Sequence, residues 1–168
     1  MNRHDLNVDR RGLVRFMGRV IPCAIGKGGI VTDKREGDGG TPVGAWRMES
    51  VHYRADRVTR PKTGLPTARI GPCDGWCDDP SETDYNEPIR LPASCSYERM
   101  RRGDTLYDIV VVLDHNRHPP RPGKGSAIFI HCWRAPRFPT AGCLAFTPKD
   151  LRWILERWDP RRSRVKIR

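Results

Sequence analysis

The chain contains only short apolar stretches, which prolines and glycines separate throughout its length. The clearest stretch, Ile109–Leu113, is continuous and mostly β-branched, and residues 126–131 repeat the pattern and end in a histidine. Apolar runs of this length are typical of buried strands, whereas a buried helix needs about ten residues or more. The 15 prolines and 16 glycines among 168 residues break up longer elements. The sequence therefore predicts a mainly β fold with many turns.

Further strands are predicted on both sides of these runs. Residues 12–26 read as two short strands with Gly18 at the turn, and residues 43–53 alternate roughly between apolar and polar side chains. Residues 164–168 read as another short strand. In contrast, residues 57–100 are rich in proline, glycine, aspartate and cysteine, so we expect a long loop that forms a wall or lid of a site.

The sequence predicts one helix over residues 147–158. Thr147 suits the N-cap, Pro148 suits the first turn, and Asp150 completes a Thr-x-x-Asp capping pattern. The apolar residues that follow recur at helical spacing and form one face: Leu151, Ile154, Leu155 and Trp158. We therefore expect one or two short helices beside the strands.

Length and charge limit the organisation and the partners of the chain. A length of 168 residues without repeats or composition shifts predicts one domain over residues 1–168. The formal net charge of +11 favours an anionic partner, whether a nucleic acid, an acidic membrane surface or an envelope polymer. The densest basic cluster lies in residues 159–168, for which a solvated tail and a binding role are equally open.

The N-terminal sequence predicts no signal peptide, because it lacks an apolar core and a cleavage site of small residues. No apolar run reaches membrane-spanning length. We therefore expect a soluble protein whose six cysteines are reduced.

Residues 127–146 carry the most specific chemical signal. A strand ends at His131, a polar loop follows, and Thr140–Cys143 (TAGC) leads into a second apolar run. A histidine at a strand end can take the proton of a nearby thiol and activate it as a nucleophile. Because Gly142 has no Cβ, a substrate carbonyl can approach the amides of residues 142 and 143, which would form an oxyanion hole. We therefore predict acyl transfer with Cys143 as nucleophile and His131 as base.

The imidazole of His131 needs an acceptor for its other ring nitrogen. No carboxylate lies near it in sequence, so we expect a backbone carbonyl, such as that of Cys132, to take this role. The alternative interpretation makes Cys143 a small buried apolar residue and His131 a core residue. The joint pattern of strand, histidine, loop and Gly-Cys favours the functional interpretation.

His131 and the TAGC turn, with residues 34–46 (KREGDGGTPVGAW), resemble the catalytic domain of the L,D-transpeptidases, the YkuD-like family. That family has a histidine, a loop and Ser/Thr-x-Gly-Cys, preceded by a Thr-Pro-x-Gly-aromatic segment. Thr41–Gly44 match the second motif, with one residue inserted before Trp46. The resemblance covers roughly residues 12–158.

The resemblance implies a β-sandwich of mixed sheets that acts on peptidoglycan stem peptides or their fragments. In the implied reaction the Cys143 thiolate attacks the carbonyl at the L-centre of diaminopimelate, expels D-alanine and forms a thioester. An amine of a second stem, a lipoprotein lysine or water then resolves it. The resemblance also implies His131 as base, the Gly142 and Cys143 amides as oxyanion hole, and the Cys132 carbonyl as acceptor.

The resemblance further suggests carbapenem-type inhibitors as ligands and the periplasm or cell envelope as the location, while the missing signal peptide leaves the cytoplasm open. We expect a monomer that needs no cofactor or metal and binds no nucleic acid. Five residues are expected to contact substrate: Thr140, Ala141, Trp133, His115 and Asn116.

The chain departs from the family pattern at three points. Cys132 follows the histidine where members usually have Gly or Ser, and Ala145 stands where many have Arg. The spacing of twelve residues from His131 to Cys143 is also short. These departures concern donor and acceptor selectivity rather than acyl chemistry.

Two rival functions remain open. A cysteine carboxypeptidase would use the same pair of residues with water as the acceptor. A basic nucleic-acid-binding domain would need zinc on Cys73 and Cys77, with further ligands from Cys95, His115 or His118. For these cysteines, unlinked thiols are favoured over a disulfide or zinc.

Overall fold

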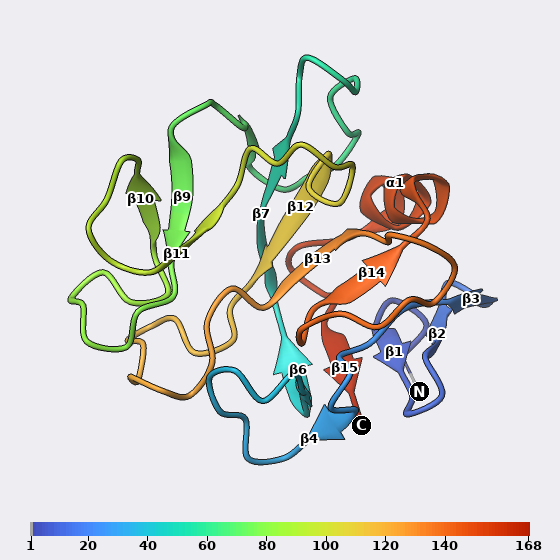
Figure 1. Ribbon diagram of the computed structural model, residues 1–168. Helices are drawn as coiled ribbons and strands as arrows, with labels where there is room; N and C mark the ends of the chain where they lie inside the picture. Colours follow the sequence, from blue (N-terminus) through green and yellow to red (C-terminus); the bar gives the residue numbers. More distant parts are fainter. Residues whose placement is uncertain (1) are drawn as a thin grey trace.

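Two five-stranded sheets enclose the main hydrophobic core, and two smaller sheets lie beside them (Figure 1). The computed structural model describes residues 2–168. Strands hold 33% of the residues and helix 6%, with one helix in the described part of the chain. The predicted mainly β sandwich of mixed sheets is confirmed. Among the described residues, no helix is both long and apolar enough to span a membrane.

The first sheet brings the two ends of the chain together. Its strands, in spatial order, are β3 (Arg19–Pro22), β2 (Leu13–Phe16), β1 (Leu6–Val8), β15 (Val165–Ile167) and β6 (Gly44–Trp46). β1 and β15 run parallel, with Leu6 opposite Val165, and the other neighbours are antiparallel. The two short strands predicted in residues 12–26 and the strand in 164–168 are confirmed.

The basic segment 159–168 is therefore not a solvated tail. Its strand β15 lies between two partners, and the side chains of Val165 and Ile167 are buried in the core. Strand residues alternate between the two faces of a sheet, so Lys166, which lies between Val165 and Ile167, points away from the core. Its ammonium forms an ion pair with Asp5 at 2.8 Å.

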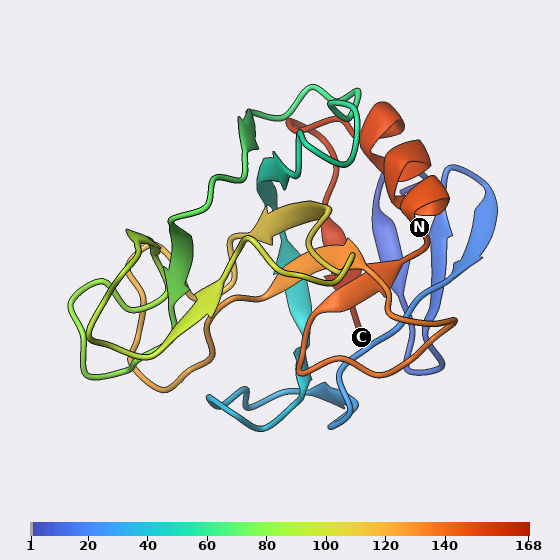
Figure 2. The ribbon, with the colours of Figure 1, turned by 45° about the horizontal axis from the view of Figure 1, so that its top comes forward.

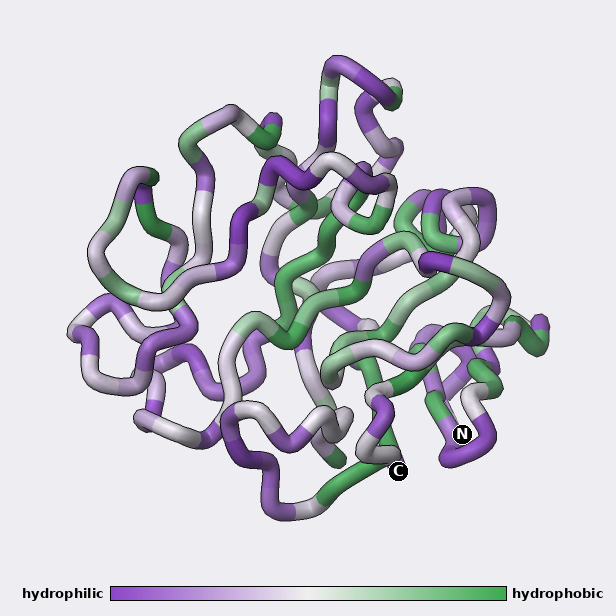
Figure 3. Tube along the Cα trace, in the orientation of Figure 1, coloured by the Kyte–Doolittle hydropathy of each residue, from purple (hydrophilic) through white to green (hydrophobic). Residues whose placement is uncertain are grey.

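The second sheet positions the candidate site. Its order is β14 (Leu144–Phe146), β13 (Phe129–Cys132), β12 (Ile109–Leu113), β7 (Met48–Tyr53) and β8 (Thr67–Arg69). All five residues of β12 are buried, because both faces of this sheet are covered. Ile109, Val111 and Leu113 join the main core, while Val110 and Val112 join a second apolar cluster. The most hydrophobic part of the chain follows β12 and β13 through the centre of the molecule (Figure 3).

Residues 43–53 form two strands rather than the single strand predicted. β6 pairs with β15 in the first sheet, and β7 pairs with β12 in the second. The chain changes sheets at Arg47, whose backbone N–H donates to Asp114 at 2.7 Å. The alternating pattern continues through this change, which is why the sequence suggested one element.

The predicted long loop over residues 57–100 is also wrong in part. Besides β8, it holds β9 (Asp74–Cys77), β10 (Pro88–Arg90) and β11 (Tyr97–Arg99), which form an antiparallel sheet in the order β10-β9-β11. Strands of three or four residues leave little periodicity in a sequence rich in proline and glycine. Trp76 of β9 packs edge-on against Phe129 of β13, with ring centroids 4.9 Å apart, so this small sheet covers the second cluster.

The helix α1 spans Pro148–Arg157 and confirms the prediction. Thr147 is its N-cap and accepts a hydrogen bond from Asp150 N at 2.9 Å. α1 contacts β13 and β14, and its Trp153 packs edge-on against Phe16 of β2. Figure 2 shows the helix lying beside the strands of the first sheet. The parallel pair β4 (Ile30–Val31) and β5 (Thr41–Pro42) completes the fold.

We predict that Ile167→Ala lowers the free energy of unfolding by about 2–5 kcal/mol, because it leaves a cavity at a fully packed position of β15. Urea denaturation measures this loss. The matched control is Arg161→Ala, an exposed residue of the same segment, which should change stability by less than about 0.5 kcal/mol. Equal effects of both substitutions would contradict the placement of β15 in the core.

Candidate active site

A cavity of about 310 Å³ lies beside β13 and β14 and holds both predicted reactive residues, Cys143 and His131. Thr140, Ala141 and Trp133 also line it, as expected for substrate-binding residues. Its charged lining consists of Lys27, Glu98, Arg102 and Arg134. Apart from Glu98, these charges are cationic and suit an anionic ligand.

Cys143 lies directly before β14 and is 8% exposed. Its Sγ donates a hydrogen bond to the Ala127 carbonyl at 3.2 Å and accepts one from Phe129 N at 3.4 Å. Burial, helped by the negative charge of Glu98, raises the pKa of the Cys143 thiol to about 12. The Cys143 side chain is therefore a neutral thiol at neutral pH.

His131 lies on β13, opposite Ala145 of the parallel neighbour β14. Its Nδ1 is 2.8 Å from the Cys132 carbonyl, which is the hydrogen bond that the sequence predicted. Nδ1 is therefore the N–H donor, and Nε2 is left as the acceptor. Burial lowers the pKa of His131 to about 4, so the imidazole is neutral at pH 7. The side chain of Cys132 lies in the main core, so only its backbone serves the site.

The resting pair is uncharged, since both pKa shifts favour the neutral forms. The thiol hydrogen bonds go to Ala127 and Phe129, and none joins Sγ to His131 in the described chain.

The TAGC turn is fixed by its own hydrogen bonds. Gly142 N donates to Thr140 Oγ1 at 3.1 Å, and Thr140 Oγ1 donates to the Cys143 carbonyl at 2.6 Å. The Gly142 amide is therefore occupied, whereas the Cys143 amide has no protein acceptor within residues 2–168. Of the two amides predicted as an oxyanion hole, only that of Cys143 is free in this state.

Gly142 is required here by a contact that the sequence does not show. Its φ is +141°, and a Cβ at this position would lie 2.8 Å from the Gly40 carbonyl oxygen. The group that excludes a Cβ at residue 142 is thus the Gly40 carbonyl of the Gly-rich segment 34–46, not a substrate carbonyl.

Thr41 connects that segment to the turn. Its side chain is fully buried, accepts from Gly26 N at 2.8 Å and donates to the Gly142 carbonyl at 2.9 Å. The Thr-Pro-x-Gly motif therefore supports the nucleophile from behind the turn.

We predict that Thr41→Val lowers the free energy of unfolding by about 1–3 kcal/mol, because it leaves the Gly26 amide and the Gly142 carbonyl without their buried partner. Thr41→Ser keeps the hydroxyl and is the matched control. Urea denaturation of both variants is the measurement, and a greater loss for the serine variant would show that the methyl group matters more than these bonds.

His115 and Asn116 do not line the cavity, although they were expected to bind substrate. His115 Nε2 lies 3.1 Å from the Lys124 carbonyl, and its ring packs edge-on against Trp46. The Asn116 side chain donates to backbone carbonyls of residues 121 and 125. Both side chains hold the loop after β12, as polar residues at a strand end often do.

Glu98 and Tyr107 are among the residues of the cavity that the sequence did not indicate. The Tyr107 hydroxyl donates to Glu98 Oε2, and the Tyr107 ring packs edge-on against His131 with centroids 5.3 Å apart. No motif marks either residue, because one lies on β11 and the other in the loop before β12.

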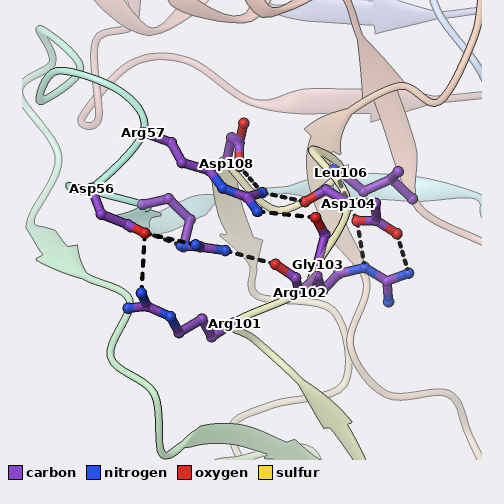
Figure 4. A network of polar contacts seen from close by, with 9 residues as sticks. Asp56, Arg57, Arg101, Arg102, Gly103, Asp104, Leu106 and Asp108 are labelled. Atoms are coloured by element: carbon purple, nitrogen blue, oxygen red, sulfur yellow. Dashed lines mark hydrogen bonds and ion pairs between the residues drawn. The ribbon is translucent and has the colours of Figure 1, made fainter.

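Hydrogen bonds from arginines fix the backbone of the loop before β12 (Figure 4). Arg54 donates to the Arg102 carbonyl at 2.7 Å, and Arg57 donates to the Asp104 carbonyl at 2.6 Å. Arg102 itself forms two bonds to the Asp104 carboxylate, at 2.9 and 2.8 Å. These bonds hold the backbone that presents Arg102, Leu106 and Tyr107 to the cavity.

The zinc site considered from the sequence has no ligand set in the described chain. Cys77 Sγ lies 3.9 Å from Cys95 Sγ, and all six cysteines are free thiols. No three His, Cys, Asp or Glu side chains within residues 2–168 are placed to hold a metal ion.

Fold and site together define a mainly β protein with a histidine on one strand and a cysteine directly before the parallel neighbouring strand, both at one cavity. The sequence profile of the L,D-transpeptidase catalytic domain (YkuD) matches residues 2–167. The chain belongs to this family, whose activity is L,D-transpeptidase-type catalysis on peptidoglycan. The match is longer than the resemblance over residues 12–158. No curated protein and no solved structure matches the chain.

We predict that iodoacetamide alkylates Cys143 slowly at pH 7 and faster at every step up to about pH 10, because burial raises the thiol pKa and thiolate is the reactive form. Peptide mass spectrometry follows the reaction, with the half-buried Cys95 as internal reference. A rate plateau between about pH 5 and 8 would reveal a preformed thiolate–imidazolium pair and contradict the neutral resting state.

Proposed function

We propose that this protein is a cysteine L,D-transpeptidase that forms a thioester on Cys143 with a peptidoglycan stem peptide. The observation that carries the proposal is the shared cavity of Cys143 and His131 in a chain of this family. The basic lining from Lys27, Arg102 and Arg134 supports it, because stem peptides carry several carboxylates.

In the proposed first step, His131 Nε2 takes the thiol proton as Sγ attacks the carbonyl carbon of the third residue. The Cys132 carbonyl stabilises the imidazolium through its bond to Nδ1–H, and the free Cys143 amide donates to the developing oxyanion. The imidazolium then protonates the nitrogen of D-alanine, which leaves as the C–N bond breaks.

In the second step an amine attacks the thioester carbonyl, and His131 accepts its proton while Sγ leaves. Water can replace the amine, which would make the protein a carboxypeptidase. Product analysis with and without an added amine acceptor separates the two activities.

We predict that Cys143→Ala abolishes acylation, because no other thiol lies at the cavity. Intact mass spectrometry after incubation with a carbapenem should show one adduct on the wild type and none on the variant. Cys95→Ala, which removes a free thiol outside the cavity, is the matched control and should be acylated normally. An adduct on Cys143→Ala would remove Cys143 from the mechanism.

A further inference from the structure

Glu98 is the one acidic residue that lines the cavity of Cys143 within the described chain. Its Oε2 accepts a hydrogen bond from the buried Tyr107 hydroxyl, which orients the carboxylate. No other side chain or backbone group in residues 2–168 bonds to the Glu98 carboxylate, and no arginine or lysine of these residues forms an ion pair with it.

Among residues 2–168, the cations near Glu98 form no ion pair with its carboxylate. Arg102 directs its guanidinium to Asp104, with which it forms a two-bond ion pair. Lys27 and Arg134 line the same cavity without contacting the carboxylate. A cationic group of a ligand can therefore pair with the oriented Glu98 carboxylate in this cavity.

The burial of Glu98 strengthens the interaction of its carboxylate with a cation. Burial raises the pKa of Glu98, although the hydrogen bond from Tyr107 and the charge of Arg102 oppose the shift. A carboxylate with few water neighbours gains more from a bound cation than an exposed one does.

We propose that Glu98 recognises a primary ammonium group of the substrate beside Cys143. This proposal rests on the function proposed above and assigns to Glu98 the selection of amine-bearing stem peptides. The amine belongs either to the side chain of the third residue in the donor or to the acceptor, and the chemistry of recognition is the same.

Binding of the ammonium also affects the nucleophile. The negative charge of Glu98 opposes formation of the Cys143 thiolate, and a bound cation offsets that charge. An amine-bearing substrate would thus both occupy the cavity and ease the deprotonation of the thiol.

Isothermal titration tests the donor source without turnover. A stem tetrapeptide with a third-residue side-chain amine, and the same peptide with that amine acetylated, are titrated into Cys143→Ala and into Cys143→Ala/Glu98→Gln. Glu98→Gln should weaken binding of the free amine about 10- to 100-fold, the range for a charge-assisted hydrogen bond, and leave the acetylated peptide unchanged.

The acceptor source is tested on enzyme acylated by a carbapenem, into which the tripeptide and its acetylated form are titrated. If Glu98 favours the free amine over the acetylated form in the tetrapeptide titration, the recognised ammonium belongs to the donor. If Glu98 does so in the tripeptide titration, the recognised ammonium belongs to the acceptor. Glu82→Gln, which removes an exposed carboxylate outside the cavity, is the matched control and should change neither affinity.

Equal binding of free and acetylated peptides in both arms overturns the proposal, as does an equal loss for both forms in Glu98→Gln. Failure of the carbapenem to acylate the wild type would instead count against the proposed function, while the donor arm still reports on Glu98. Tyr107→Phe releases the carboxylate without removing it, so its loss for the free amine should be smaller than that of Glu98→Gln.

Discussion

The parallel pairing of β13 with β14 determines where the reactive atoms of the site lie. His131 is opposite Ala145, so the turn that leads into β14 brings Cys143 to the face of the sheet that carries the imidazole. Because strand side chains alternate, Ile130 and Cys132 face the main core when His131 faces the cavity. A register shift of one residue would exchange these two sets, so the hydrophobic packing on one face fixes the chemistry on the other.

The same packing controls the charge state of the pair. Desolvation acts in opposite directions on an acid and a base, and it leaves the thiol protonated and the imidazole free of charge. The Cys132 carbonyl replaces the acidic residue of a conventional triad, which avoids a further buried charge. Both side chains are therefore uncharged in the protein without a ligand.

The sequence predicted the parts of the fold whose pattern is local. The buried strand β12, the helix after Thr147, and the pair His131 and Cys143 each have a signal within twenty residues. The strands β9, β10 and β11 have none, because they are very short and their stability comes from pairing with one another and from Trp76. Glu98 and Tyr107 meet only through that tertiary arrangement, so no spacing in the sequence could place them in the cavity.

The position of β15 between β1 and β6 has a consequence for how the protein is made. β1 and β15 pair across about 160 positions, so the central ladder of the first sheet closes only after residue 167 has left the ribosome. Contacts between such distant residues carry a high entropic cost of closure and are associated with slow folding. Until β15 is in place, the edges of β1 and β6 are unpaired and can pair with other chains. Nascent and partly folded molecules are therefore more prone to aggregation and to chaperone binding than the folded protein.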